Sequence, residues 1–455
     1  MNSFIKKVKS GKKLLKNFGK KFKKSSSSSS PSSQVINETC EKCNDVDCNV
    51  KYFKRNFQNW TSGNNDIDTF IQSTQLSAHY NVDDVLEWVP YEKFYNIEYI
   101  AKGGYGMVYK ANWIDGIIFD WDDKIKNWKR KDKNKLVALK KLNDSNNIDL
   151  EFMNKIVSHY KVNFSDRIIK FYGITQDPKT KHYIMIFDYA ENGSLRNYLN
   201  KNFNNLNWEN KISFLNDIAI GLEHIHENEI NHQNLHTGNI LYMGDINICI
   251  TDIGLCKPVD CSSTSENNIC GVLPYMAPEI LQGQNYTKAS DVYSFGIIAY
   301  EIISGLPPFH DLSHDENLAI KICQGHRPRF NIMVPQLIVK LIKRCLDANP
   351  LKRPTTKEIT KVISQLLDGW DCLELRKQIN EIYETNQSNL TLSYGIHPEA
   401  IYISRLLNFN NLPTPKNYSN YYERDDDIIT MEDSGLLLID TIDNSQINVS
   451  VTYYS

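Results

Sequence analysis

The pattern of hydrophobic and polar positions changes character within the central part of the chain. From residue 94 onward, short segments with alternating β-branched and aromatic residues predict strands separated by turns. After Gly193 the apolar residues recur at the three- and four-residue spacing of helices, and this continues to residue 367. Strands followed by helices favour an α+β unit with two lobes over a doubly wound sheet.

The flanking segments divide the rest of the chain. We assign residues 1–37 to a basic arm with a serine-rich linker, 38–93 to a cysteine-containing, partly helical extension, 94–367 to the main domain, and 368–455 to an acidic, asparagine-rich tail. Residues 51–88 predict short helices that pack on the main domain. We expect the two ends of the chain to be disordered, and no fold is assigned to the tail.

Three tryptophans lie in a long insertion between the second and third strands of the main domain. Trp113, Trp121 and Trp128 alternate with charged residues. This pattern favours an extended hairpin with one apolar face over a platform that stacks nucleic-acid bases. No nucleic-acid partner is expected.

The net charge is −2, but the charged residues are distributed unevenly along the chain. Residues 1–24 carry +10, residues 371–455 carry −8, and the remainder carries −4. In the basic arm, apolar residues at near-heptad spacing between lysines are typical of peripheral contact with an anionic membrane. A solvated basic arm or a nuclear-import signal remains the alternative.

The sequence predicts an intracellular, cytoplasmic protein. The longest apolar run is too short to span a bilayer, and the N-terminus lacks the apolar core of a secretory signal. The ten cysteines are therefore expected to be reduced. Cys40, Cys43 and Cys48 have spacing partly typical of zinc ligands, but the next histidine or cysteine is His79, so we expect a degenerate or absent metal site.

Several short motifs follow one another in the main domain. A glycine-rich segment, IAKGGYGMV, runs from Ile100 to Val108, and Lys140 then lies within an apolar strand, where an anionic partner is expected. HQNLHTGN spans residues 232–239, and TDIG spans residues 251–254. The segments APE at 277–279 and DVYSFG at 291–296, followed by Arg353, complete the series.

In this order the motifs resemble the signature set of the eukaryotic protein kinases. The segments GSL, GVLPYMAPE and NPLKRPT resemble the tyrosine-kinase-like branch, and the flanking segments resemble an expanded family of fungal kinase-like paralogues. The resemblance covers residues 94–367 and implies a β-rich N-terminal lobe, a helical C-terminal lobe, and ATP and Mg²⁺ as cofactors.

The resemblance also assigns residues to the expected nucleotide site. Lys140 would hold the α and β phosphates, and Asn239 and Asp252 would be the ligands of Mg²⁺. The residues that would surround the nucleotide are Ile100, Gly103, Gly106, Val108, Ala138, Lys140, Phe187 as gatekeeper, Asp188 and Ala190 in the hinge, and Leu241 as the floor of the base pocket. Glu279 and Arg353 would pair, and Asp291 would hold the catalytic loop.

The departures from the family pattern concern catalysis. Asn234 stands where the family has the aspartate that accepts the substrate proton, and Gln233 and His236 replace the neighbouring basic residues. Lys155 aligns with the glutamate that pairs with the strand lysine, and Glu151, one helical turn earlier, could substitute only if the helix slides.

Three hypotheses follow from these residues. The chain is a nucleotide-binding pseudokinase or a strongly impaired kinase acting in signalling; or it is a slow serine/threonine kinase that transfers the γ-phosphate to protein hydroxyls; or it is a scaffold that no longer binds nucleotide. Its protein partner or substrate is not evident from the sequence.

Overall fold

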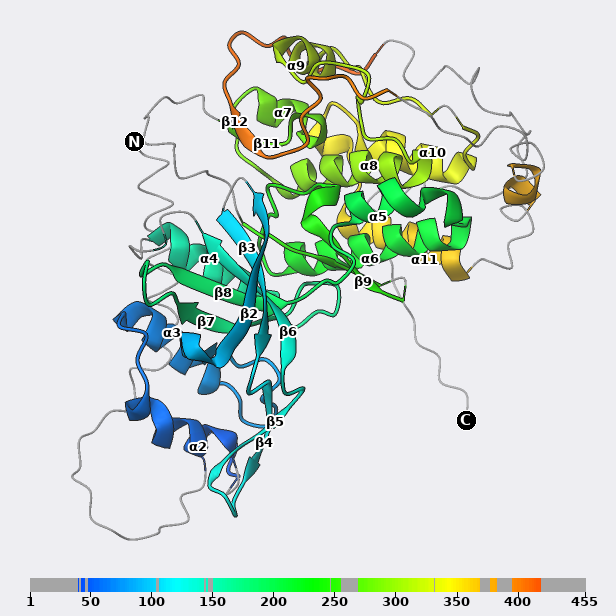
Figure 1. Ribbon diagram of the computed structural model, residues 1–455. Coiled ribbons are helices and arrows are strands. Elements are labelled where there is room, and N and C mark those ends of the chain that lie inside the picture. Colours follow the sequence, from blue (N-terminus) through cyan, green and yellow to red (C-terminus); the bar gives the residue numbers. More distant parts are fainter. Residues whose placement is uncertain are drawn as a thin grey trace, which may run out of the picture.

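A computed structural model describes residues 40, 42–45, 48–103, 106–142, 145, 150–245, 247–254, 269–330, 332–368, 377–382 and 395–418. These residues form a strand-rich lobe and a helical lobe that meet along one side (Figure 1). The two-lobed α+β architecture predicted for residues 94–367 is therefore confirmed. The described part contains no helix long and apolar enough to cross a membrane.

The strand-rich lobe is built on one sheet of six strands in the order β1-β7-β8-β6-β3-β2. β1 pairs with β7 in parallel, and the other neighbours are antiparallel. The strands are β1 (Glu87–Trp88), β2 (Phe94–Gly103), β3 (Gly106–Trp113), β6 (Lys135–Leu142), β7 (Phe171–Gln176) and β8 (Tyr183–Asp188). Because β1 comes from the N-terminal extension, the extension completes the sheet of the main domain.

The tryptophan-containing insertion is a hairpin of β4 (Ile117–Asp122) and β5 (Asn127–Lys131). Helix α2 (Asn49–Asn56) covers it, with the ring of Tyr52 stacked on Trp121 at 4.2 Å and that of Phe53 on Trp128 at 4.3 Å between centroids. The structure thus has the predicted hairpin for Trp121 and Trp128, and the extension packs on its apolar face. Trp113, predicted to lie in the same insertion, is instead the last residue of β3 in the main sheet.

Two helices pack together in the strand-rich lobe. Helix α3 (Asn65–Gln75) begins at Asn64, whose side chain accepts hydrogen bonds from the amides of Asp66 and Ile67 and so satisfies two unpaired donors. It packs against α4 (Leu150–Lys161), where Phe70 and Tyr160 meet edge to face with centroids 5.6 Å apart. The extension therefore packs directly against α4 through α3.

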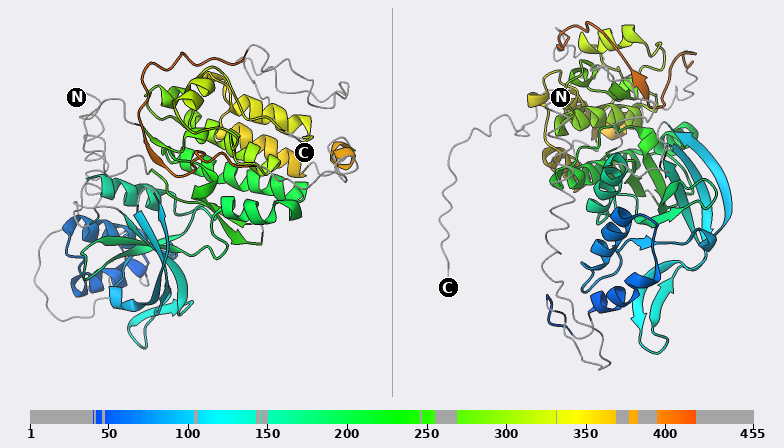
Figure 2. Two further views of the ribbon diagram at one scale, coloured as in Figure 1. Left: turned by 45° about the horizontal axis from the view of Figure 1, so that its top comes forward. Right: turned by 90° about the vertical axis from the view of Figure 1, so that its left-hand side faces the viewer.

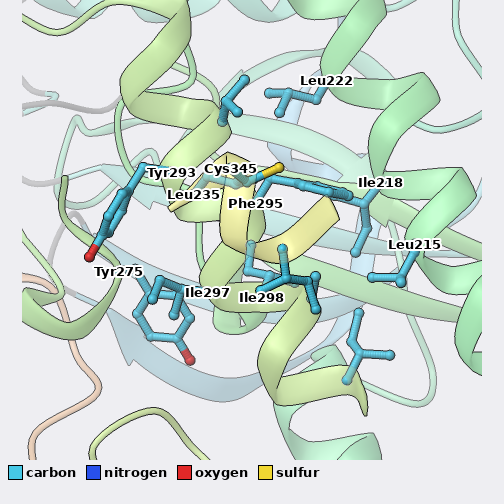
Figure 3. Close-up of a cluster of buried hydrophobic side chains, with 14 of the residues drawn as sticks. Leu215, Ile218, Leu222, Leu235, Tyr275, Tyr293, Phe295, Ile297, Ile298 and Cys345 are labelled. Atoms are coloured by element: carbon cyan, nitrogen blue, oxygen red, sulfur yellow. The ribbon is translucent and has the colours of Figure 1, made fainter. Parts of the chain in front are cut away.

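The helical lobe surrounds α8, whose residues are buried from Ser290 to Ser304. A reciprocal cap between Thr287 and Ser290 begins this helix, and Gly305 at φ +73° ends it. Figure 3 shows side chains of α6 and α8 facing one another in this core, among them Ile218 and Phe295. The helices are α5 (Leu195–Asn202), α6 (Trp208–Glu227), α7 (Pro278–Leu281), α8 (Lys288–Ser304), α9 (Glu316–Cys323), α10 (Gln336–Cys345) and α11 (Thr356–Asp368).

Short elements connect these helices and carry the motifs. β9 (Ile240–Gly244) pairs with β10 (Asn247–Ile250). Single 3₁₀ turns lie at Phe57–Asn59, Tyr91–Lys93, Phe203–Asn205, Thr237–Asn239, Leu273–Tyr275 and Pro350–Lys352.

Part of the C-terminal tail is folded onto the helical lobe. Residues 395–418 run across it, and β12 (Arg405–Leu407) pairs antiparallel with β11 (Ile269–Gly271), as the orange strand shows in Figures 1 and 2. The expectation of a disordered tail is therefore corrected for residues 395–418, because backbone pairing and the burial of Leu407 (6% exposed) fix this segment. Residues 1–39 and 419–455 lie outside the described residues.

Candidate nucleotide and peptide site

Lys140 and Asp252, far apart in sequence, meet between the lobes. Lys140 lies on β6 opposite Val108 of β3, is 9% exposed, and donates to the carboxylate of Asp252 in a close ion pair. Burial works to raise the pKa of Asp252, but the charge and hydrogen bond of Lys140 together with the nearby His159 and His232 outweigh it, so the pKa of this carboxyl is lowered. The lysine thus has the anionic partner expected of a cation in an apolar strand.

The residues predicted to surround the base come together at the same place. Ala138 on β6 is the register partner of Phe187 on β8, and Leu241 on β9 packs on the same apolar cluster. Phe187 is buried, whereas Ala138 and Leu241 are only partly covered. The chain leaves β8 through Asp188, which pairs with Lys135 at 3.1 Å.

The strands that flank the glycine-rich turn are also in place. Gly103 and Gly106 are register partners at the ends of β2 and β3. At Gly106, with φ +155°, a Cβ would lie 2.1 Å from the carbonyl oxygen of Lys141, so only glycine fits beside β6. A Cβ at Gly103 would meet nothing within 4 Å, and Ile100 on β2 is 43% exposed. Residues 104 and 105 lie outside the described residues.

Asp291 holds the loop at 232–239 from beneath. Its carboxylate accepts hydrogen bonds from the amides of His232 at 2.7 Å and Gln233 at 2.9 Å. The His232 ring in turn lies 2.9 Å from the carbonyl oxygen of Thr251, next to Asp252. Burial lowers the pKa of His232, so this ring is neutral and links the two loops by hydrogen bonding alone. Asp291 and His232 therefore take the structural roles expected of them.

Asn239 connects the same two loops. Its side-chain nitrogen donates to the carbonyl oxygen of Asn234 at 2.9 Å, and its own carbonyl oxygen accepts from the amide of Thr251 at 2.9 Å. Because its amide nitrogen is bound, the amide oxygen is the atom of Asn239 that would hold a metal ion, and Asp252 would supply carboxylate oxygens from the next loop. Amide and carboxylate oxygens fit Mg²⁺.

Asn234 occupies the centre of the loop and contacts the C-terminal segment. Its Oδ1 accepts a hydrogen bond of 2.9 Å from the hydroxyl of Ser404. Asn234 is 6% exposed, and its Nδ2 has no hydrogen-bond partner among the described residues. The carboxamide side chain of Asn234 cannot take up a proton near neutral pH, so it can orient a hydroxyl group without deprotonating it.

Helix α4 carries Lys155, the residue that the sequence comparison aligned with the acidic residue of the family. Lys155 is 7% exposed on this helix, and among the described residues the recorded ion pair of Lys140 is with Asp252. The side chain of Glu151, the proposed substitute, lies outside the described residues. One turn beyond Lys155, the ring of His159 accepts the amide hydrogen of Ile253 at 3.3 Å, which ties α4 to the loop that carries Asp252.

A buried polar cluster beside the catalytic loop was missed in the sequence. Arg196 of α5 donates to the hydroxyl of Tyr275 at 3.0 Å and to the carbonyl oxygen of Tyr402 at 2.8 Å. Glu301 accepts from the hydroxyl of Thr237 at 3.0 and 3.1 Å. The carboxylate at Glu301 interrupts the apolar run from Phe295 to Ile303, which is a signal that the sequence does contain. Nothing in the sequence marks the contact of Ser404.

The predicted ion pair of Glu279 and Arg353 is present in the helical lobe. Arg353 donates to both carboxylate oxygens of Glu279, at 2.7 and 2.8 Å, and both side chains are buried. Two parallel bonds of this kind fix the geometry at the end of α7.

Comparison with known proteins identifies the family of the main domain. Residues 95–363 match the family described as protein tyrosine and serine/threonine kinase. Two probable serine/threonine-protein kinases of Dictyostelium discoideum are 26% and 27% identical to this chain, over 63% and 61% of its length. A probable LIM domain-containing serine/threonine-protein kinase of the same organism is 27% identical over 65% of this chain.

The matched region is only part of each relative. It covers 16% and 28% of the first two proteins and 44% of the third. The similarity therefore concerns the kinase domain and not the whole of those proteins. With the two-lobed fold, the lysine and aspartate pair, and a family match over more than half of its length, the chain belongs to the protein tyrosine and serine/threonine kinase family.

Proposed function

We propose that this chain is an ATP- and Mg²⁺-binding protein of the kinase fold in which phosphoryl transfer is strongly slowed, and that it acts in signalling as a pseudokinase or an impaired kinase. The observation that carries this proposal is the pairing of a retained lysine and metal-ligand set with an amide, Asn234, at the position of the catalytic base.

The binding half rests on charge and shape. Lys140 is a buried cation whose present partner, Asp252, is also the expected metal ligand. With nucleotide bound, Lys140 would hold phosphate oxygens, and Asp252 and Asn239 would hold Mg²⁺, which neutralises the phosphates. Ala138, Phe187 and Leu241 would enclose the base.

The catalytic half rests on what Asn234 cannot do. General-base catalysis contributes a factor of about 10² to 10⁴ to a rate, and an amide supplies none of it. Positioning of the hydroxyl and electrostatic stabilisation by Lys140 and the metal ligands are still available. The expected result is a protein that binds ATP with a slow or absent transfer step.

A slow serine/threonine kinase is the second candidate, and one contact favours it. The hydroxyl of Ser404 already donates to Asn234, so the site can hold a serine side chain where a phosphate acceptor belongs. In this case the residual rate comes from positioning and electrostatics alone.

Nucleotide binding and transfer should be measured side by side in the full chain. ATP with Mg²⁺ at a hundred times its Kd should stabilise the fold by about 2.7 kcal/mol in a thermal-shift titration. Lys140→Met and Asp252→Ala should abolish the shift, whereas the surface variant Lys288→Met should retain it. No shift at millimolar ATP would remove the binding half and leave a scaffold.

Transfer of radiolabelled phosphate to a generic protein substrate separates the two candidates. Asn234→Asp should raise the rate by about 10² or more if the rest of the site is sound. An unchanged rate would show that another defect, such as the cation at Lys155, limits the reaction.

A cytoplasmic location with peripheral membrane contact through residues 1–24 is also part of this proposal, and the ten lysines of that segment support it. Deletion of residues 1–24 should abolish co-sedimentation with phosphatidylserine-containing vesicles at low salt. Equal binding of both chains would contradict it.

A further inference from the structure

Three cysteines and one histidine of the N-terminal extension converge on one point. The ligand atoms of Cys40, Cys43, Cys48 and His79 all lie within 4.8 Å of one another. Nδ1 of His79 lies 3.4 Å from Sγ of Cys40 and 3.3 Å from Sγ of Cys48. None of the three cysteines forms a disulfide.

These spacings are close to those of a tetrahedral metal site. Zinc binds sulfur at about 2.3 Å and imidazole nitrogen at about 2.0–2.1 Å, so tetrahedral sulfur and nitrogen ligands lie about 3.6 Å apart. The observed separations of 3.3 and 3.4 Å need little adjustment. Three thiolates and one imidazole form a complete, soft ligand set, which suits zinc and leaves no position open for catalysis.

The chain builds this arrangement from a tight turn and the ends of two helices. The amide of Asn44 donates to the carbonyl of Cys40 at 2.8 Å, and Asn44 takes the left-handed conformation at φ +56°. Cys48 directly precedes α2 and is 1% exposed, and His79 follows α3. Cys48 and His79 are 31 residues apart in sequence, and the packing of α2 near α3 brings His79 to the cysteines.

We propose that Cys40, Cys43, Cys48 and His79 form a structural zinc site. The metal joins Cys40, Cys43 and the start of α2 to the segment that follows α3. Because α2 covers the β4–β5 hairpin, the site also holds the extension on the strand-rich lobe.

The full chain, expressed with zinc and purified under reducing conditions, provides the test. Metal analysis should find about one zinc per chain, and exchange with Co²⁺ should give the visible absorption of tetrahedral cobalt with a thiolate charge-transfer band. His79→Ala and Cys48→Ser should lose most of the metal and both spectral features. His79→Cys should retain them because it preserves four soft ligands.

Cys249→Ser is the matched control, since Cys249 is a buried cysteine on β10 and is not one of the four clustered ligands. It should keep the full zinc content. Zinc-free wild-type protein, a disulfide among the three cysteines, or an unchanged zinc content in His79→Ala would each overturn the assignment. Metal content and cobalt spectra also separate loss of the site from loss of the fold, because His79→Cys keeps the ligands while His79→Ala does not.

A second and independent observation concerns residues 395–418, which we call the strap. The ring of His314 contacts the backbone of Ile401, with 2.9 Å to its carbonyl oxygen, and the hydroxyl of Tyr402 donates to the carbonyl of Pro308 at 3.0 Å. Farther along, the amide of Lys416 donates to the carbonyl of Cys323 at 3.0 Å. The strap is thus anchored to the helical lobe at both ends.

Between these anchors the strap passes over the catalytic loop. Leu407 is 6% exposed and joins the core of the helical lobe, while β12 pairs residue by residue with β11, directly before the turn at Leu273–Tyr275. Immediately before β12, Ser404 is 8% exposed and donates to Asn234. An extended peptide with its hydroxyl at the catalytic position is the arrangement of a bound substrate.

We infer that the strap occupies the peptide-substrate site in cis, with Ser404 at the acceptor position, and this inference rests on the proposed function of the same site. The contacts define the class of peptide that fits: a serine with an aromatic residue two positions before it and a leucine three positions after it. Tyr402 packs on Arg196 at 5.2 Å and edge to face on His314 at 4.8 Å.

Tethering explains why an outside peptide would compete poorly. A segment in the same chain acts at an effective concentration of order millimolar, so a free peptide at micromolar concentration is excluded unless the strap is displaced. Removing the contact of Leu407 should therefore open the site.

The strap can be tested in the full chain with a fluorescein-labelled peptide of residues 395–411. We expect no binding to the wild type at 10 µM by anisotropy, and binding to Leu407→Asp, in which a charge replaces a buried side chain. Leu406→Asp is the matched control, because Leu406 is 42% exposed on the same strand, and it should behave as the wild type. Tyr402→Ala is a second, milder release variant.

Hydrogen–deuterium exchange shows whether release is local. In Leu407→Asp, exchange should quicken over residues 397–409 and 269–276, with the remaining lobe unchanged. Absence of peptide binding to both release variants, or equal binding to the wild type, would overturn the inference. The thermal shift with ATP, measured in all variants, tests the proposed function separately. If the release variants bind the peptide but ATP causes no thermal shift, only the proposal of nucleotide binding is contradicted.

Discussion

His159 gives the strand-rich lobe a sensitivity to acid that can be calculated. Its ring is 3% exposed, lies against Phe187 with centroids 5.0 Å apart, and accepts the amide hydrogen of Ile253. Burial lowers the pKa of His159 to about 3, although the charge of Asp252 works in the opposite direction. The folded chain therefore keeps this ring neutral where the unfolded chain would protonate it.

The sign and size of the pH effect on the free energy of unfolding follow from the difference in protons bound by the unfolded and folded chain. The unfolded ring titrates near pH 6.5, so between pH 6.5 and 3 the unfolded chain binds one proton that the folded chain does not. This contribution to stability is complete above pH 6.5 and is lost as the pH falls, by up to about 1.4 kcal/mol per pH unit. Between pH 7.5 and pH 5 the integrated loss from His159 is about 2 kcal/mol.

Urea unfolding of wild type and His159→Gln at several pH values between 7.5 and 5 is the appropriate assay. Tryptophan fluorescence reports mainly the strand-rich lobe, which holds Trp60, Trp88, Trp113 and the two hairpin tryptophans. Glutamine keeps an acceptor for Ile253 but does not titrate. With an m value of about 2 kcal/mol/M, the wild-type midpoint should fall by about 1 M more than that of the variant. Parallel pH profiles for the two proteins would refute the reasoning.

Three further predictions concern stability. Gly173→Ala should destabilise the strand-rich lobe by about 1–3 kcal/mol, because its Cβ would lie 2.1 Å from the carbonyl oxygen of Glu87 and disturb the pairing of β1 with β7; an unchanged midpoint in urea would contradict this. Arg353→Met should cost about 3–5 kcal/mol by leaving the carboxylate of Glu279 buried alone, and adding Glu279→Gln should recover part of the loss in thermal melts. Tyr52→Ala should cost about 3 kcal/mol locally and speed proteolysis within α2, since its ring stacks on the hairpin; equal cleavage rates would count against that contact.

Features encoded in short segments could be predicted from the sequence. Lys140, Asp252 and Asn239 each lie in a local motif, and the order of those motifs implied that a kinase fold would bring them together. The hairpin was likewise visible in the alternation of Trp121 and Trp128 with charged residues. In each case the signal lies within a few residues of the group it describes.

Contacts between distant segments could not be predicted in this way. Ser404 and Asn234 are separated by 170 residues, and neither the strap nor β12 has a local pattern stronger than that of other polar segments. His79 lies in an ordinary turn, and only the packing of α2 and α3 brings it to the cysteines. Such contacts depend on tertiary packing, which the spacing of residues along the chain does not reveal.

The support that α3 gives to α4 limits how far the catalytic defects can be relieved by motion. For Glu151 to take the place of Lys155, α4 would have to shift by about one turn, roughly 5.4 Å along its axis. Its buried face, which includes Phe152 and Ile156, packs in one cluster with Phe70 of α3, and that register would be lost. The packing of α4 on α3 therefore resists the one movement that would bring Glu151 to the position of Lys155.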